Sequence, residues 1–227
     1  MRVLAIDTAL GQCAACVLDT TEPDPLALET LAMERGHAEA LIPLLDRVMS
    51  RVEGSFGSLD RVVVTIGPGS FTGLRVGIAA ARAVGLGTGR PTVGVTTLSA
   101  LMSPLVEAGS TRLVAAAIEA RGGRVFVQAI APSGRLVIPP SVMTYRHVVR
   151  ALGSGSVTLV GSGAPAVAEE ARGVGLDARL YSAGPLPDIR WVARLGAAAD
   201  PDQALAKPLY LAAPDARPQD GARIARL

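Results

Sequence analysis

One order of secondary-structure patterns occurs twice along the chain: a meander of strands, then alternating helices and strands. In the first copy, helices are predicted over 38–52, 71–87 and 97–108, and strands at 2–7, 14–20, 26–34, 61–67 and 91–95. A looser second copy has helices near 164–173 and 189–199, and strands at 112–120, 124–130, 135–138, 157–163 and 207–211. This order predicts an α/β protein with two similar halves, residues 1–108 and 109–227.

Composition narrows the range of functions. The chain has 227 residues, of which 49% are hydrophobic, so a sizeable core is expected. The net charge is only +2 and aromatic residues make up 3%, which disfavours strong binding to nucleic acid by this chain alone. The apolar stretch Gly73–Gly89 carries Arg75 and Arg82, which argues against a membrane span. We expect a soluble, cytoplasmic protein.

The two cysteines form a C-x-x-C motif, Cys13 to Cys16, but their context is not that of a redox or zinc site. Residues three apart on a strand point to opposite faces of a sheet. A zinc site would need two further ligands, and the sequence has no third cysteine. We therefore expect both thiols to be structural, with no bound metal.

A glycine-rich turn, "TIGPGSFTGLRVG", joins a β-branched strand to a helix. It lacks the lysine of a Walker A loop, because Leu74 follows Gly73. The spacing of Gly69 and Gly73 also departs from the dinucleotide fingerprint, and Pro68 removes a backbone donor. A generic anion at the helix N-terminus remains an alternative.

The helix after this turn carries small residues at every fourth position: Gly73, Gly77, Ala81 and Gly85. Such residues form one line on a helix and let another backbone approach closely. Glycine within a helix costs about 1 kcal/mol relative to alanine, so a packing reason is expected. The neighbour could be this chain's own sheet or a partner protein.

Several motifs together resemble the TsaB family, also called YeaZ. They are "LAIDTA", "ERGHAEALIPLLDRVM", "GPGSFTGLRVGIAAARAVGLG", "VGVTTLSAL", "AAIEARGGRVF" and "KPLYLAAPDARP", and the resemblance is strongest over residues 4–101. It implies an actin-like ATPase (ASKHA) fold with two ribonuclease-H-like halves and mixed sheets. It also implies a non-catalytic subunit needed to make threonylcarbamoyladenosine, next to the anticodon of tRNA.

The resemblance implies partners as well. They are a catalytic TsaD-like subunit, a TsaE-like ATPase and a TsaC-like enzyme that supplies the intermediate, with a homodimer as a further possibility. Transfer RNA would be met only through the complex, and no membrane is involved. No cofactor is expected to bind tightly, although ATP could lie at a subunit boundary.

Single residues agree with a non-catalytic role. The catalytic paralogue has two metal-binding histidines four apart, whereas here His37 is followed by Leu41. The positions of the nucleotide site look degenerate: Asp7, Glu119, Gly161 and Gly163. An autonomous phosphotransferase that holds magnesium on Asp7 and Glu119 is the alternative function, and a glycoprotease-type peptidase ranks last.

For the partner interface, we expect the predicted helices 38–52 and 71–87 to face the partner. Two such helices from each of two related subunits would form a four-helix contact. Its expected residues are Leu41, Ile42, Leu45, Met49, Gly73, Leu74, Gly77, Ile78 and Ala81. On this hypothesis, Gly77→Leu abolishes pairing in a chain that stays folded, and Arg179→Ala does neither.

Overall fold

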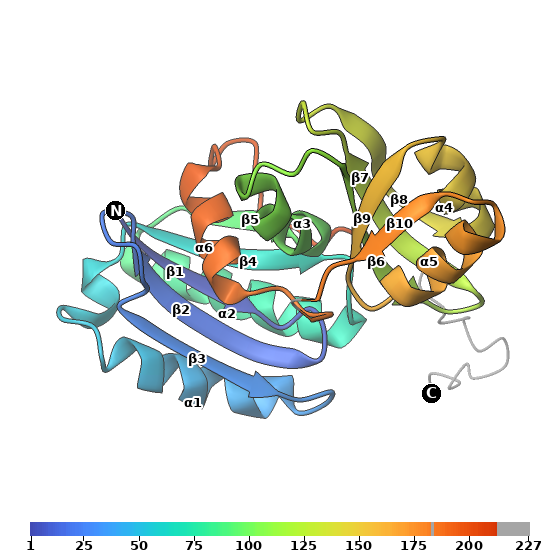
Figure 1. The fold of residues 1–227 in the computed structure, drawn as a ribbon. Coiled ribbons are helices and arrows are strands. Elements are labelled where there is room, and N and C mark those ends of the chain that lie inside the picture. The colour runs from blue at the N-terminus through green and yellow to red at the C-terminus, as the bar shows by residue number, and fades with distance from the viewer. Residues whose placement is uncertain (183, 213–227) are drawn as a thin grey trace, which may run out of the picture.

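The computed structural model describes residues 1–182 and 184–212, in which the strands form two five-stranded mixed sheets (Figure 1). The first sheet has the order β3-β2-β1-β4-β5, and its strands are β1 (Arg2–Asp7), β2 (Gln12–Asp19), β3 (Ala27–Ala32), β4 (Arg61–Gly67) and β5 (Thr92–Thr96). The second has the order β10-β9-β6-β7-β8, and its strands are β6 (Leu113–Ala120), β7 (Arg124–Ile130), β8 (Leu136–Thr144), β9 (Ser156–Val160) and β10 (Asp177–Leu180). Both sheets therefore place an antiparallel meander beside two parallel strands.

The helices follow the same order in each half. They are α1 (His37–Met49), α2 (Phe71–Thr88), α3 (Thr97–Glu107), α4 (Tyr145–Leu152), α5 (Ala164–Gly173) and α6 (Ile189–Ala198), with a short 3-10 turn η1 (Ser55–Ser58). Side-chain caps define several starts: Ser70, Thr96, Thr144 and Asp188 each accept a hydrogen bond from a backbone N–H in the first turn. No helix in the described ranges is long and apolar enough to cross a bilayer.

The last helix of each half packs on the sheet of the other half. Helix α6 lies against β1, β2 and β4 of the first sheet, on the face opposite α1 and α2. The alternation of β1 explains this arrangement, because Leu4 faces α1 and α2 while Val3 and Ala5 face α6. Helix α3 packs mainly against β6 of the second sheet, where Leu98 and Met102 meet Ile118. The exchange ties the two halves together through apolar burial.

The predicted division at residue 108 falls between α3 and β6, so each sheet lies on one side of it. The exchanged helix α6, however, belongs to the first sheet in space although it comes from the second part of the chain (Figure 1). The pattern missed α4 and β10, and it predicted β8 too short. It was wrong about a strand at 207–211: these residues run as irregular chain, and the β-bridge nearby joins Leu205 to Val93.

Candidate functional site

The carboxyl end of β1 carries Asp7, which is fully buried. Its Oδ1 accepts hydrogen bonds from the Thr65 hydroxyl at 2.6 Å and from the backbone N–H of Ala9 at 3.0 Å. Its Oδ2 accepts from Nε2 of Gln12 at 2.7 Å, and the same nitrogen donates to the carbonyl of Pro187 at 2.8 Å. We call these residues the Asp7 network. It links the start of the first half to the segment that leads into α6.

Burial sets the electrostatics of this network. Removal from water raises the pKa of Asp7, and the hydrogen bonds from Thr65, Gln12 and Ala9 partly oppose that rise. Three donors already occupy the two carboxylate oxygens.

The fold that the resemblance implies would bring a nucleotide with magnesium to this strand end. A hard cation needs oxygen ligands that can turn toward it, and those of Asp7 are committed to the protein. Glu119 lies on the other sheet, where its Oε1 accepts a hydrogen bond from the Tyr145 hydroxyl at 3.4 Å. Within residues 1–182 and 184–212, no group of three or more His, Cys, Asp or Glu side chains is placed to hold a metal. The residues do not fit a magnesium site on Asp7.

The glycine-rich turn docks onto the residues that follow Asp7. The backbone N–H of Ser70 donates to the carbonyl of Ala9 at 2.7 Å, and the Thr8 hydroxyl donates to the carbonyl of Gly73 at 2.7 Å. A Cβ at Gly69 would lie 2.2 Å from the Ala9 oxygen. The turn therefore needs glycine at position 69 because its backbone lies directly against the chain at Ala9.

The small-residue line of α2 faces inward, which corrects the predicted interface. A Cβ at Gly73 would lie 2.1 Å from the Thr8 carbonyl oxygen, and one at Gly77 would lie 2.3 Å from the Thr8 hydroxyl. Ala81, Leu74 and Ile78 are also buried in the chain itself. These residues cannot contact a partner unless the protein opens, because the sheet and its loops already cover them.

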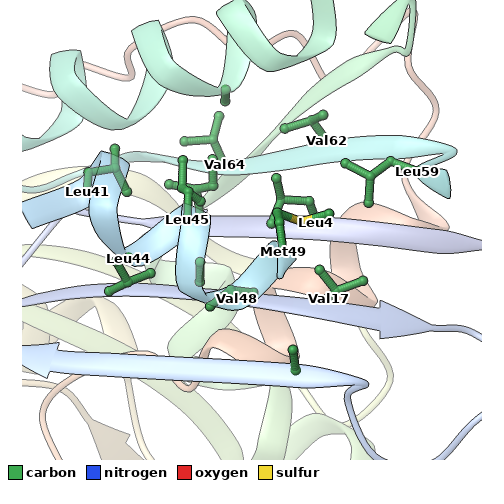
Figure 2. Packing of buried hydrophobic residues seen from close by; sticks show 14 of the residues in the cluster. Leu4, Val17, Leu41, Leu44, Leu45, Val48, Met49, Leu59, Val62 and Val64 are labelled. Atoms are coloured by element: carbon green, nitrogen blue, oxygen red, sulfur yellow. The ribbon is translucent and has the colours of Figure 1, made fainter. Parts of the chain in front are cut away.

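Helix α1 gives the same correction for three of its four predicted interface residues. Leu41, Leu45 and Met49 are buried, and Figure 2 shows them packed with Leu4 and Val64 of the first sheet. Ile42 points outward and is 62% exposed. The apolar stripe of α1 has two sides because one side packs on β2 and β3 of the sheet and the other packs on α2, not because one side is left for a partner.

In the second half, the two predicted glycines of the nucleotide site serve packing. Gly161 has φ +100°, and a Cβ there would lie 2.5 Å from the carbonyl oxygen of Ala117. A Cβ at Gly163 would lie 2.4 Å from a methyl group of Val125. Ser162 between them accepts a hydrogen bond from the backbone N–H of Glu119 at 3.0 Å. The turn from β9 to α5 is thus held directly against β6.

His37 and the cysteines are internal as well. Nε2 of His37 lies 3.1 Å from the carbonyl oxygen of Leu10, which fixes the start of α1 beside the loop after β1. Cys13 and Cys16 are buried on opposite faces of the first sheet, as predicted from strand geometry. Burial raises the pKa of Cys13 to about 11 and that of Cys16 to about 12, so both stay as thiols at neutral pH.

One exposed cluster was missed at the sequence level. Arg75 stacks on the Phe71 ring, with its guanidinium carbon 3.7 Å from the centroid, and its Nε donates to the Tyr210 hydroxyl at 3.2 Å. The rings of Phe71 and Tyr210 lie 5.5 Å apart. Phe71 and Tyr210 both belong to motifs that identify the family resemblance. Periodicity within one element cannot predict that two residues so far apart in the sequence lie next to each other.

Comparison with known proteins finds relatives of this sequence. The family model for TsaD, tRNA N6-adenosine threonylcarbamoyltransferase, matches residues 31–149. The TsaB protein of Escherichia coli is 33% identical over 127 residues, covering 56% of this chain and 53% of that protein. The TsaB protein of Haemophilus influenzae is 29% identical over 129 residues, covering 56% and 52%. The chain thus spans about half the length of the curated relatives it matches.

Solved structures extend the likeness over nearly the whole fold. A Pseudomonas aeruginosa protein described as similar to peptidase YEAZ superposes with a TM-score of 0.75 at 23% identity, covering 93% of this chain and 99% of that one. A ROK hexokinase from Thermus thermophilus superposes with a TM-score of 0.51 at 16% identity, covering 86% and 98%. These matches confirm the predicted α/β fold of the actin-like ATPase class. Since the TsaD family model covers more than half of the sequence, the chain belongs to the family that this model describes, and it is similar to the relatives named TsaB and to the YeaZ structures.

Proposed function

We propose that this chain is a non-catalytic subunit in the biosynthesis of threonylcarbamoyladenosine on tRNA, and that it binds and supports a TsaD-like catalytic subunit. The relatives named TsaB and the match to the TsaD family support the pathway. The observation that carries the non-catalytic role is the Asp7 network. The acid that an active enzyme of this fold would offer to magnesium is buried here under three hydrogen bonds.

The partner surface in this proposal is the outer face of α1 and α2. It replaces the buried residues of the earlier hypothesis with side chains that reach solvent. Ile42 on α1 is 62% exposed and Leu86 on α2 is 87% exposed, while Phe71 at the start of α2 is partly covered by Arg75 and Tyr210. Exposed large apolar side chains on neighbouring helices are typical of a protein contact. The same face could serve a homodimer.

The rest of the assembly belongs to the proposal too. A TsaE-like ATPase and a TsaC-like enzyme would work with the pair, ATP would bind at a subunit boundary, and the complex would act in the cytoplasm. The tRNA would be held mainly by the catalytic subunit, since this chain has a net charge of only +2.

Reconstitution tests the role. The purified chain, the three partners, tRNA, threonine, bicarbonate and ATP are combined, and modified adenosine is measured by mass spectrometry. We expect product only when both this chain and the TsaD-like subunit are present. Full-rate product without this chain would refute the role, and so would ATP-dependent phosphorylation of an acceptor by this chain alone.

A matched pair of variants tests the surface. Ile42→Asp should reduce pairing with the TsaD-like subunit at least tenfold, because a charge would be buried in an apolar contact. Leu180→Asp, at a side chain 53% exposed on β10, should leave pairing unchanged. Equal effects of the two substitutions on pairing would show that the interface lies elsewhere.

A further inference from the structure

A pocket lies in the second half, at the end of its sheet away from Glu119 and Gly161. Its volume is about 400 Å³. One wall is α4, another is the loop of residues 153–155 that leads into β9, and a third is the loop of residues 174–176 that leads into β10. Helices α4 and α5 pack side by side on the second sheet (Figure 1), and both contribute residues to the pocket lining. It is separate from the candidate site described above, which is built at the carboxyl ends of the strands.

Two arginines of α4 line this pocket, and both are exposed. Arg146 and Arg150 are four residues apart and therefore lie on the same side of the helix. In the part of the chain that the structure describes, neither guanidinium makes a hydrogen bond or an ion pair. Their neighbours are paired: Arg172 with Glu169, and Arg112 with Asp177. The pocket thus presents two free forks of N–H donors, which suit a phosphate or a carboxylate.

The remaining walls add two other kinds of contact. Glu170 of α5 lines the pocket and can accept hydrogen bonds from hydroxyl groups of a ligand. Val149, Leu176 and Val174 supply apolar surface, and Val174 is 66% exposed. Together the walls offer positive charge, one acceptor and an apolar side within one cavity.

Three glycines lie in the two loops that line the pocket, residues 153–155 and 174–176. Gly153, Gly155 and Gly175 have φ of +73°, +136° and +75°, conformations that residues with a side chain adopt only at a cost. A Cβ at any of the three would meet nothing within 4 Å. Internal packing therefore does not require glycine here, and the bare loops leave the pocket open.

We propose that this pocket binds a nucleoside monophosphate, either free or as one unit of an RNA strand. The phosphate lies on Arg146 and Arg150, the ribose hydroxyls donate to Glu170, and the apolar face of the ligand lies on Val174. Small-molecule sites usually measure about 300–1,000 Å³, so the cavity is large enough for such a ligand. The proposal rests on the pocket alone and is independent of the role in tRNA modification.

Calorimetry on the full chain tests the site with AMP, inorganic phosphate and adenosine as probes. AMP should bind more tightly than phosphate or adenosine alone, because only AMP can contact the two arginines, Glu170 and Val174 at the same time. The double variant Arg146→Gln/Arg150→Gln should weaken AMP binding about tenfold or more, as expected for the loss of charged hydrogen bonds. The control Arg35→Gln/Arg90→Gln removes the same charge from exposed sites of the first half and should bind AMP as the unaltered chain does.

Glu170→Gln separates the phosphate contact from the sugar contact. It should weaken AMP but leave inorganic phosphate unchanged or slightly tighter, since a like charge is removed. Absence of AMP binding, or equal losses in the pocket and control variants, would overturn the proposal. A ten-nucleotide RNA identifies the source of the ligand: tighter, salt-sensitive binding that depends on Arg146 and Arg150 indicates RNA, and binding weaker than that of AMP indicates a free nucleotide.

Discussion

The two sheets have the same strand order, yet the acids near the ends of their first strands have opposite environments. Asp7 of β1 is fully buried and accepts three hydrogen bonds, whereas Glu119 of β6 is exposed and accepts one long hydrogen bond from Tyr145. The glycine turn after β4 packs on Thr8 and Ala9, which follow β1, and the turn after β9 packs on Ala117 within β6.

The difference comes from what covers each strand end. Residues 8 and 9 dock onto the glycine turn above Asp7, and Gln12 joins that acid to the Pro187 segment of the second part of the chain. Glu119 instead leads into a tight turn with Gly122 and Gly123, both at positive φ, and receives no comparable cover. Two sheets of the same strand order can therefore bury the acid at one strand end and leave the acid at the other exposed.

The largest effect is expected from enlarging a glycine that touches the loop after Asp7. Gly77→Leu should lower the free energy of unfolding by about 3 kcal/mol or more, because the new side chain would overlap Thr8 and Val64. This result would replace the expectation of a folded variant that fails to pair. Thermal melting followed by circular dichroism measures it.

Gly87→Ala is the matched control on the same helix. A Cβ there meets nothing within 4 Å, so alanine should leave stability unchanged or raise it by up to about 1 kcal/mol. A folded Gly77→Leu variant with an unaltered melting temperature would contradict the inward orientation of the small residues.

The next effect compares the two acids directly. Asp7→Asn should destabilise the chain by about 2 kcal/mol, since an amide NH₂ would face the donors of Thr65, Ala9 or Gln12. Glu119→Gln should change stability by less than about 0.5 kcal/mol at its exposed site. Urea unfolding of both variants gives the comparison, and equal losses would show that the two strand ends are not so different.

The pH dependence of stability should have opposite signs at Asp7 and at Asp177. The pKa of Asp7 is raised by burial, so the folded state holds this proton more tightly than the unfolded state. Its contribution to stability therefore falls as pH rises from near 3.8 through the raised pKa. The Arg112 guanidinium lowers the pKa of Asp177, so its contribution is present above about 3.8 and is lost as pH falls below that value.

Unfolding curves of Asp7→Asn and Asp177→Asn, measured from pH 3 to 7 beside the unaltered chain, isolate each contribution. The difference curve for Asp7 should decline with rising pH, and that for Asp177 should rise. Two difference curves of the same sign would show that one of the two environments has been misjudged.

The smallest effect is expected at Arg179. Its Nε lies 3.9 Å from Asp177 and both side chains are exposed, so Arg179→Ala should alter stability by less than about 0.5 kcal/mol. Pairing with the TsaD-like subunit should be unaffected. A loss of several degrees in melting temperature would show that this ion pair carries more weight than its exposure indicates.

Some features followed from local pattern. The β-branched run of Val62, Val63 and Val64 predicted a buried strand, and the helical spacing of Leu41 and Leu45 predicted α1, because side-chain direction repeats with a fixed period in each element. The divergence of Cys13 and Cys16 came from the same rule. By contrast, α4 was missed because its eight residues, with two arginines and a histidine, offer too short a pattern.

For the candidate site, too, the sequence predicted the residues of interest but not their environment. The motifs identified Asp7, Glu119 and the glycine turns as places of interest, because strand ends and tight turns leave local signals. Whether those residues are open to a ligand depended on contacts between distant segments: Thr8 against Gly73, and Gln12 against Pro187. Periodicity shows which face of an element is apolar or small, but it does not show what covers that face. Only the docking of the turn on residues 8 and 9 placed the small residues of α2 against the protein's own chain. Only the contact of Gln12 with Asp7 and Pro187 completed the burial of the acid that the pattern had left open.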